Sequence, residues 1–395
     1  MNIEIAPHSK SKFPYRALIP SQKHSWFGYY DKSPWDFSGR YLLAMTVDFA
    51  DRQPEPNDAI TLGYVDLLSG KFEPFAETKA WCWQTGCMLQ WVPGTNGRTV
   101  IYNIRDGNRF GSVVHNLDTG QKKMLPLPIF CITPDGTTAL SLNFSRLANL
   151  RPGYGYVGVP DPYESQNTPE NDGIWRMDIA TGKYELIISI AEIAKIEPVD
   201  DMYGVPHWVN HIQLNPSGRR FGFLHRFRKR NTTGIITRLF TASIDGTDIY
   251  LLNPNRMNSH YDWRDDEHLL IWARVPGSTI ENPVHRFILF RDRTKQFWIV
   301  GEGILTADGH CSYSPDRKWI LTDTYPDKNN LQSLLLFDPE NEKLIELGRF
   351  FSPPVFRGEI RCDLHPRWSR DGKAICFDST MDGMRRVYVM EIERN

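Results

Sequence analysis

Residues 210–227 read NHIQLNPSGRRFGFLHRF, and this stretch decides the fold because the rest of the chain repeats its design. Apolar and polar residues alternate on both sides of an Asn-Pro-Ser-Gly turn, which predicts a strand, a tight turn and a second strand. The same order of short strand, polar turn and stronger apolar strand recurs along the chain. The other copies occupy residues 27–47, 84–104, 129–144, 259–274, 309–325 and 362–380.

Most copies are followed by a second hairpin with its own turn, as in MDIATGKYELI at residues 177–187. Two hairpins make a four-stranded antiparallel sheet. The copies recur roughly every 45 to 55 residues, the spacing of propeller blades, with a longer interval of 82 residues between the third and fourth copies. The sequence therefore predicts an all-β fold, a seven-bladed β-propeller that accounts for residues 1–395 as a single domain. A long insertion falls in the third blade, at about residues 143–173. A pair of β-sandwiches or two TIM-like halves are disfavoured, because helical periodicity occurs only near residues 187–196.

Composition limits the classes of partner. Lys and Arg total 46 and Asp and Glu total 47, so the chain lacks the basic excess of proteins that bind nucleic acids or anionic membranes. The chain has no apolar run of about 18 residues, and its N-terminal stretch lacks the apolar segment of a signal peptide. We therefore expect a cytoplasmic protein with no membrane partner. The six cysteines form no CxxC pair, which argues against a disulfide framework. The oligomeric state is left open.

Aligning the repeats on their turns places a histidine at the same position in four consecutive copies. Seven residues before the turn glycine, the fourth repeat has His211 and the seventh has His365. The fifth and sixth repeats have His260 and His310 there. The first three repeats have Lys32, Met88 and Ile129. Three residues further on, the four histidine-containing repeats have large residues that we expect to pack between blades, namely Leu214, Trp263, Tyr313 and Trp368.

The shared position of the histidines points to a metal. The first strand of each propeller blade lines the central channel, so imidazoles on its channel side would converge, and neutral histidine is both a common metal ligand and a general base. Cys362 and Asp363 add two donors just before His365. Such ligands suit zinc or manganese better than calcium. We expect a divalent transition metal with candidate ligands His260, His310, Cys362, Asp363 and His365. The alternative is a structural plug of hydrogen-bonded histidines.

These residues resemble those of the oligogalacturonate lyases, cytoplasmic seven-bladed propellers that cleave uronic-acid oligosaccharides by β-elimination with a histidine-bound manganese ion. The chain is also similar to the propeller-fold ulvan and rhamnose-glucuronate lyases. The best match is RCDLHPRWSRDGKAICFDSTMDGMRRVYVMEI at residues 361–392, which implies that His365 is the last metal histidine. Where the family has another histidine and a glutamine as ligands, this chain has Asp363 and Ile360.

Two further stretches carry the resemblance. SHYDW at residues 259–263 implies that His260 is the first metal histidine, and NHIQLNPSGRRFGFLH at residues 210–225 implies that His211 is the base. β-Elimination of a uronoside needs a base for the C5 proton and positive charge on the carboxylate. Arg226 and Arg228 on the adjoining strand are the candidates for binding that carboxylate, a task that a metal could share as a Lewis acid.

The insertion in the third blade supplies further candidate substrate-binding residues. Its arginines suit carboxylates and its tyrosines suit pyranose faces, so we expect a sugar-binding wall of Arg146, Arg151, Tyr154 and Tyr156. The alternative is an ordinary loop packed by its own aromatic residues. Tyr30, in the first repeat, is a further candidate for the channel mouth.

Three functions follow from these residues. The first is a carbon-oxygen lyase that cleaves an anionic, uronate-containing oligosaccharide by metal-assisted β-elimination. The alternative is a non-catalytic carbohydrate-binding or scaffolding propeller that has kept the histidines and lost the chemistry. A glycoside hydrolase is a third possibility, which the histidines disfavour because that mechanism needs paired carboxylates.

Overall fold

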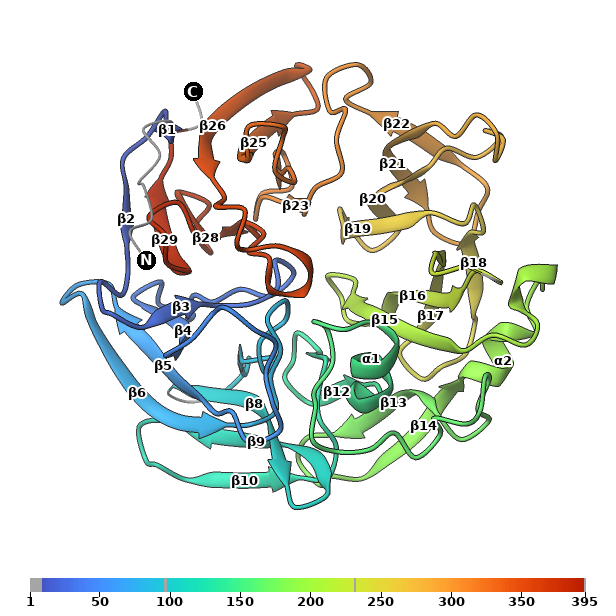
Figure 1. Ribbon diagram of the computed structural model, residues 1–395, viewed down its shortest axis with the longest axis horizontal. Helices are drawn as coiled ribbons and strands as arrows, with labels where there is room; N and C mark the ends of the chain where they lie inside the picture. Colours follow the sequence, from blue (N-terminus) through green and yellow to red (C-terminus); the bar gives the residue numbers. More distant parts are fainter. Residues whose placement is uncertain (1–8, 96–97, 231, 394–395) are drawn as a thin grey trace. The chain divides into compact units, whose positions relative to one another are not determined.

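The computed structural model describes residues 9–95, 98–230 and 232–393. Within these residues the strands form seven antiparallel sheets, which we call blades 1–7 in the order of the repeats (Figure 1). The fold is the predicted all-β, seven-bladed β-propeller. Residues 1–8 of the N-terminal stretch, residues 96 and 97 in the second repeat, and residues 231, 394 and 395 lie outside the described residues.

Blades 1 to 3 each have four strands. Blade 1 consists of β3 (His24–Trp26), β4 (Tyr41–Val47), β5 (Ile60–Asp66) and β6 (Lys71–Thr78). Blade 2 consists of β7 (Gln90–Trp91), β8 (Thr99–Asp106), β9 (Arg109–Asn116) and β10 (Lys122–Leu125). Blade 3 consists of β11 (Cys131–Ile132), β12 (Thr138–Ser141), β13 (Gly173–Asp178) and β14 (Tyr184–Ser189).

Blades 4 to 6 repeat the arrangement. Blade 4 consists of β15 (His207–Leu214), β16 (Arg220–Arg228), β17 (Ile235–Ser243) and β18 (Tyr250–Asn253). Blade 5 consists of β19 (Asn258–Trp263), β20 (His268–Arg274), β21 (His285–Arg291) and β22 (Phe297–Val300). Blade 6 consists of β23 (Ser312–Tyr313), β24 (Ile320–Asp323), β25 (Leu331–Asp338) and β26 (Lys343–Phe351), with β1 (Lys10–Ser11) added at the edge of β26.

Blade 7 takes its outer strand from the other end of the chain. Its own repeat provides β27 (Arg367–Trp368), β28 (Ala374–Ser379) and β29 (Arg386–Glu391), and β2 (Tyr15–Ala17) pairs antiparallel with β29. The sequence pattern did not predict this exchange, because three residues are too few to show a strand period.

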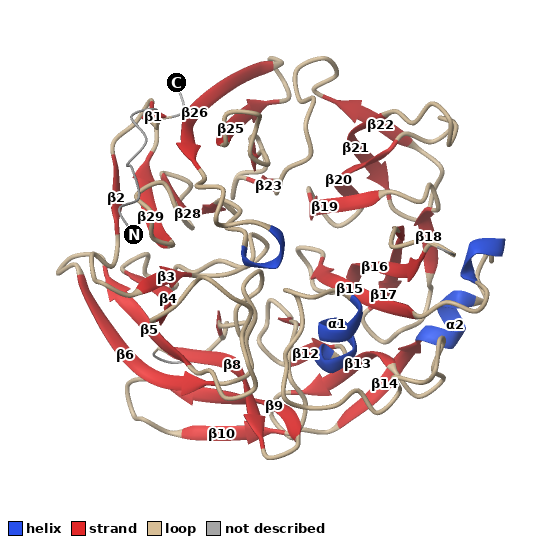
Figure 2. Ribbon diagram, in the orientation of Figure 1, coloured by secondary structure: helices blue, strands red, loops and turns tan. Residues whose placement is uncertain are grey.

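Helices are few and short (Figure 2). They are α1 (Phe144–Leu150), α2 (Ile190–Ala194) and two 3-10 turns at Asp200–Met202 and Gly358–Ile360. Helix α2 falls within the stretch 187–196 where helical periodicity was seen. Helix α1 was not predicted; it starts where the Asn143 side chain accepts a hydrogen bond from the backbone N–H of Arg146. Among the described residues, no helix is both long and apolar enough to span a membrane.

The turns of five blades confirm the alignment of their repeats. The turn glycines of blades 1, 3, 4 and 7 all have a left-handed backbone, with φ values of +75°, +72°, +71° and +68°. These residues are Gly39, Gly136, Gly218 and Gly372. Blade 6 has Arg317 at this position, and its φ is also left-handed, at +62°. The same turn therefore forms where glycine, the residue that adopts it without strain, is replaced.

The chain divides into two compact units. The first unit comprises Met1–Trp91 and Gly303–Asn395, and so contains blades 1, 6 and 7; the second comprises Val92–Glu302, with blades 3 to 5 and β8 to β10. The single domain over residues 1–395 stays a prediction.

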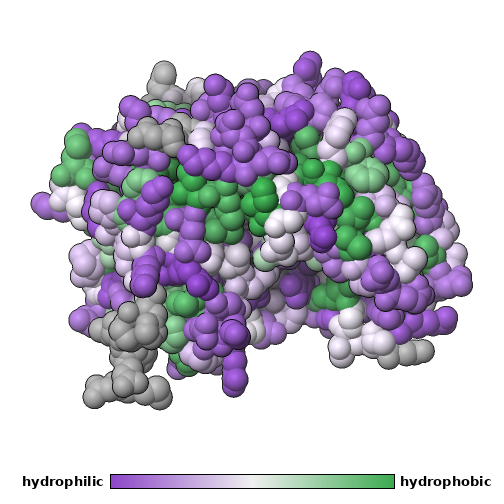
Figure 3. Space-filling model, turned by 90° about the horizontal axis from the view of Figure 1, so that it is seen from above, coloured by the Kyte–Doolittle hydropathy of each residue, from purple (hydrophilic) through white to green (hydrophobic). Residues whose placement is uncertain are grey.

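Apolar side chains fill the space between neighbouring blades within each unit. Trp368 belongs to a buried cluster with Leu321 and Leu334 of blade 6, and Trp263 packs with Leu224 of blade 4. Both tryptophans were predicted to pack between blades. On the face drawn in Figure 3, green hydrophobic residues lie in separate areas among purple hydrophilic ones.

A buried chain of hydrogen bonds in the second unit holds two histidines neutral. The Met202 carbonyl can only accept, so Nε2 of His207 donates to it, at 2.8 Å. Nδ1 of His207 then accepts from Nε2 of His225, at 2.9 Å, and Nδ1 of His225 accepts from the Arg238 guanidinium, at 3.0 Å. Burial, with Coulombic repulsion from Arg238, lowers the pKa of His207 to about 4 and that of His225 well below its usual value.

This arrangement predicts a loss of stability in acid. Between pH 6.5 and pH 4 the unfolded chain takes up a proton at His207 that the folded chain does not, so the free energy of unfolding falls as the pH falls. The contribution of His207 alone amounts to about 3 kcal/mol by pH 4. Urea unfolding at several pH values should show a flatter pH dependence in His207→Gln than in the wild type. Equal slopes in the two proteins would contradict this assignment.

Candidate functional site

Three of the predicted metal ligands form one cluster in the first unit. His310, Asp363 and His365 each offer a ligand atom, and these atoms all lie within 4.8 Å of one another. The exposed fractions of the three residues are 1%, 3% and 3%. His310 lies two residues before β23 and His365 two residues before β27, so equivalent positions in blades 6 and 7 supply the imidazoles. We call these three residues the metal cluster.

The ring orientation of both histidines is fixed through Nδ1. Nδ1 of His310 donates to the Asp323 carboxylate, with distances of 2.9 and 3.0 Å to its two oxygens. Nδ1 of His365 donates to the Gly28 carbonyl at 2.9 Å. With the proton on Nδ1, the lone pair of each neutral ring lies on Nε2, the atom that can bind a metal.

The third member of the cluster is a carboxylate. Oδ2 of Asp363 accepts a hydrogen bond from Nε of Arg361 at 2.8 Å and lies 3.9 Å from Nε2 of His365. Oδ1 of Asp363 is buried and has no hydrogen-bond partner among the described residues. A buried oxygen without a partner is costly unless something binds it. Two imidazoles and one such carboxylate fit a divalent transition metal.

Backbone geometry explains how the histidines reach this position. His365 has a left-handed φ of +42°, and the equivalent residues His211 and Met88 have φ values of +54° and +55°. For residues other than glycine this backbone is strained, and such strain is typical of functional sites. Before His310 stands Gly309, where a Cβ would lie 1.8 Å from the Asp323 carbonyl oxygen. Only glycine therefore allows His310 to approach Asp323 this closely.

Aromatic residues of blade 1 pack against both imidazoles. The ring of Tyr30 lies 5.2 Å from that of His310, and the ring of Tyr29 lies 5.1 Å from that of His365. Tyr30 is the only one of the predicted substrate-binding residues that lies in the first unit with the metal cluster. Beside it, a short ion pair joins Lys32 to the fully buried side chain of Asp31.

Two glutamines hold the backbone just before Asp363. Nε2 of Gln84 donates to the Arg361 carbonyl at 3.1 Å, and Nε2 of Gln332 donates to the Cys362 carbonyl at 3.2 Å. The Arg385 guanidinium also donates to the Arg361 carbonyl, at 3.0 Å. Sequence reasoning missed Gln332, Arg385 and Asp323. The only signal for Asp323 was a carboxylate at the end of an apolar strand.

Two predicted metal ligands are not in the cluster. Cys362 is next to Asp363 in sequence, but burial raises the pKa of its thiol to about 12, so its sulfur is protonated at neutral pH. All six cysteines are buried. His260 lies in β19 of the second unit, where its Nδ1 is 3.2 Å from Oγ of Ser259. Its role as a ligand stays a prediction.

The predicted base and carboxylate-binding residues lie in blade 4 of the second unit. His211 is 2% exposed, at a bulge in β15, and its ring stacks on Tyr261 with centroids 4.4 Å apart. Arg226 is half-buried in β16, opposite Trp208. Arg228 donates to the backbone carbonyls of Thr233 and Leu150. Their catalytic roles stay predictions.

The insertion in blade 3 is packed largely by its own side chains. The Arg146 guanidinium is 2% exposed; it pairs with Asp161 and donates to backbone carbonyls at residues 163, 166, 167 and 207. Tyr156 is fully buried, and its ring is parallel to that of Phe144, 4.2 Å away. Such contacts are the ones expected of an ordinary loop packed by its own aromatic residues, which was the alternative to a sugar-binding wall.

Two other residues of the predicted wall behave similarly. Tyr154 is 4% exposed, and the Arg151 guanidinium lies 5.0 Å above its ring. The backbone N–H of Arg151 ends α1 by donating to the Leu147 carbonyl. The sugar-binding roles of the four predicted wall residues stay predictions.

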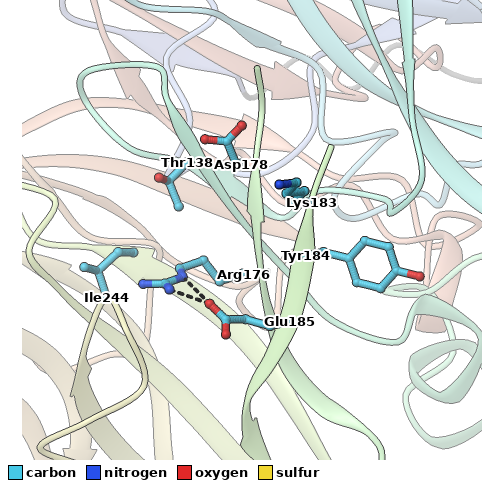
Figure 4. A pocket seen from close by; sticks show the side chains of 7 residues that line it. All are labelled: Thr138, Arg176, Asp178, Lys183, Tyr184, Glu185 and Ile244. Atoms are coloured by element: carbon cyan, nitrogen blue, oxygen red, sulfur yellow. Dashed lines mark hydrogen bonds and ion pairs between the residues drawn. The ribbon is translucent and has the colours of Figure 1, made fainter. Parts of the chain in front are cut away.

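One cavity of the second unit is lined by paired polar and charged side chains. A cavity of about 440 Å³ is bordered by β13, β14 and Ile244 (Figure 4). Its Arg176 pairs with Glu185 across the opening, and its Asp178 accepts from Thr181. Arg176, Glu185 and Asp178 therefore each have a partner, as on an ordinary polar surface.

Comparison with known proteins supports the fold. No family model and no curated protein matches the chain. Among solved structures, an oligogalacturonate lyase from Vibrio parahaemolyticus is similar, with a TM-score of 0.67 and 14% identity over 98% of this chain and 96% of that one. An oligogalacturonate lyase in complex with manganese has a TM-score of 0.70 and 15% identity over the same shares. The β-propeller domain of the trilobed protease from Pyrococcus furiosus has a TM-score of 0.54 and 9% identity, over 94% of this chain and 97% of that domain. At such identities the likeness is one of fold, and at that level it confirms the resemblance found in the sequence.

Proposed function

We propose that the protein is a divalent-metal-dependent lyase that cleaves uronic-acid-containing oligosaccharides by β-elimination. The observation that carries this proposal is the metal cluster, a buried pair of oriented imidazoles with a carboxylate oxygen that lacks a partner. The similar fold of an oligogalacturonate lyase in complex with manganese supports it. The uronate glycan is an anionic oligosaccharide, and its recognition would rest on local charge because the chain has no basic excess.

His310 and His365 would each hold the metal through Nε2, and Asp363 would hold it through a carboxylate oxygen. A bound divalent metal would supply Lewis-acid stabilisation of the negative charge that develops on the substrate carboxylate. We favour manganese over zinc, because carboxylate ligands suit manganese and the soft donor Cys362 lies outside the cluster. Tyr30 packs against His310, and we assign it to contact with the sugar.

The elimination itself needs a base. We assign this role to His211, as the resemblance implies. A neutral imidazole takes the C5 proton, the electron pair of that C–H bond forms the C4–C5 double bond, and the bond from C4 to the leaving oxygen breaks. The leaving oxygen then takes a proton from water. Arg226 and Arg228 remain the proposed partners of the carboxylate.

A panel of uronic oligosaccharides tests the reaction class. A lyase produces a 4,5-unsaturated uronide, seen as a rise in ultraviolet absorbance, and the rise should stop when a chelator is added. New reducing ends without that absorbance would show a hydrolase. Binding of the oligosaccharide without either product would favour the non-catalytic carbohydrate-binding propeller.

His211→Ala is expected to keep the fold and the metal and to lose turnover by roughly 100- to 10,000-fold, the usual contribution of a general base. The matched control is His268→Ala, which removes a partly exposed histidine of the same unit that pairs with Asp265. Full elimination activity in His211→Ala would remove this residue from the mechanism.

A further inference from the structure

Asp323 accepts hydrogen bonds from both halves of the metal cluster. Its Oδ1 accepts from the backbone N–H of His310 at 2.7 Å, and its Oδ2 accepts from the backbone N–H of His365 at 3.1 Å. The same carboxylate also accepts from Nδ1 of His310. It comes from the end of β24, is 1% exposed, and receives three N–H groups from two different blades.

On this basis we infer that Asp323 is a positioning residue that presets His310 and His365 for metal binding, an inference that rests on the proposed function. Only a group that accepts in every direction satisfies three converging donors, and an ionised carboxylate is such a group. By accepting from Nδ1, Asp323 selects the tautomer of His310 whose lone pair lies on Nε2. By accepting from both backbone N–H groups, it fixes the separation of the two ligands before the metal arrives.

Asparagine distinguishes this role from a purely structural one, because it has the same shape as aspartate. Its amide retains one acceptor oxygen but adds an NH₂ group that would face a ring N–H of His310. The imidazole can then accept from the amide only by moving its proton from Nδ1 to Nε2, which removes the lone pair that binds the metal. Residues that hydrogen-bond to metal ligands in this way typically affect metal affinity by 10- to 100-fold.

The test measures Mn²⁺ affinity by titration calorimetry of metal-free protein, without any activity assay. Asp323→Asn should bind Mn²⁺ roughly 10- to 100-fold more weakly than the wild type. The matched control is Asp327→Asn, in the same β24–β25 hairpin, whose carboxylate pairs with Arg349 at 2.5 Å. It removes the same charge and should leave the affinity unchanged. Equal affinities of Asp323→Asn and the control would overturn the inference, whatever their thermal stabilities.

A second measurement holds even if Asp323→Asn does not fold. Nitrogen-15 chemical shifts of the histidine rings in the metal-free wild type should show His310 as the Nδ1–H tautomer, with the peak assigned by its loss in His310→Ala. A predominant Nε2–H tautomer would overturn the inference. A wild type that binds no Mn²⁺ but shows the Nδ1–H tautomer would overturn the proposed function and leave the tautomer assignment standing.

Discussion

Replacing His365 by alanine is expected to abolish metal binding. Among the described residues, the imidazole supplies one of the three clustered ligand atoms, and its Nδ1–Gly28 hydrogen bond orients it for that role. The loss of Mn²⁺ affinity should exceed the roughly 10- to 100-fold effect of residues that only hydrogen-bond to a ligand. Plasma mass spectrometry of protein purified without a chelator measures the metal content directly.

His260→Ala is the informative companion to this variant. The sequence resemblance implies that His260 is a ligand, whereas the metal cluster consists of His310, Asp363 and His365. The cluster predicts that His260→Ala keeps its metal and that His310→Ala loses it. Loss of metal in His260→Ala would support the ligand set expected from the sequence. Normal metal content in His365→Ala would show that the cluster does not bind the metal.

Arg367→Met is expected to lower the free energy of unfolding by about 3 to 5 kcal/mol, the cost of leaving one partner of a buried ion pair unpaired. Nη2 of Arg367 lies 2.6 Å from the Asp378 carboxylate, and the two side chains are 1% and 2% exposed. The same guanidinium donates to the carbonyls of Gly28 and Tyr29, so the variant also frees the loop that orients His365. Urea denaturation at neutral pH measures the loss.

An exposed ion pair provides the control for Arg367→Met. Arg40 pairs with Asp66 at 2.7 Å, but its side chain is 45% exposed, so Arg40→Met should change the free energy of unfolding by less than about 1 kcal/mol. If Arg367→Met were no more destabilising than Arg40→Met, the buried pair would not be a main support of the blade 7 to blade 1 packing.

The fold could be predicted from the sequence because it is repetitive. The same turn recurs in seven copies, and most copies have a glycine, the residue that adopts the left-handed backbone of this turn without strain. These local patterns identify the blades without any long-range information. A local repeat carries no information about contacts between distant parts of the chain, so features that depend on such contacts could not be predicted. β2 joins blade 7 from the N-terminal end, and the sequence gives no sign of a pairing between Tyr15 and Met390.

Part of the metal cluster could also be predicted from the sequence. The shared register of His310 and His365 predicted equivalent positions, and the nearness of Asp363 to His365 in sequence made it a natural third donor. The shared register could not distinguish these residues from His260. An alignment shows that residues occupy equivalent positions in their repeats, but it does not show how far apart their side chains lie. Asp323 could not be predicted, because its role rests on three hydrogen bonds from His310 and His365 that form only in the folded chain.

The insertion in blade 3 shows that residue composition alone does not identify a sugar-binding site. Arginines and tyrosines suit sugar binding, yet the same residue types also tie a long loop together. Arg146 does so by donating to four backbone carbonyls, which a sequence pattern cannot distinguish from a carboxylate-binding site.

A metal titration of activity tests whether the metal cluster supports elimination of a uronate. Metal-free protein is mixed with uronic oligosaccharide and increasing Mn²⁺, while ultraviolet absorbance follows the unsaturated product. We predict no product without metal, a rise that levels off near one equivalent of Mn²⁺, and no rise in His365→Ala. Product formation that is equally fast in metal-free wild type and in His365→Ala would contradict the account.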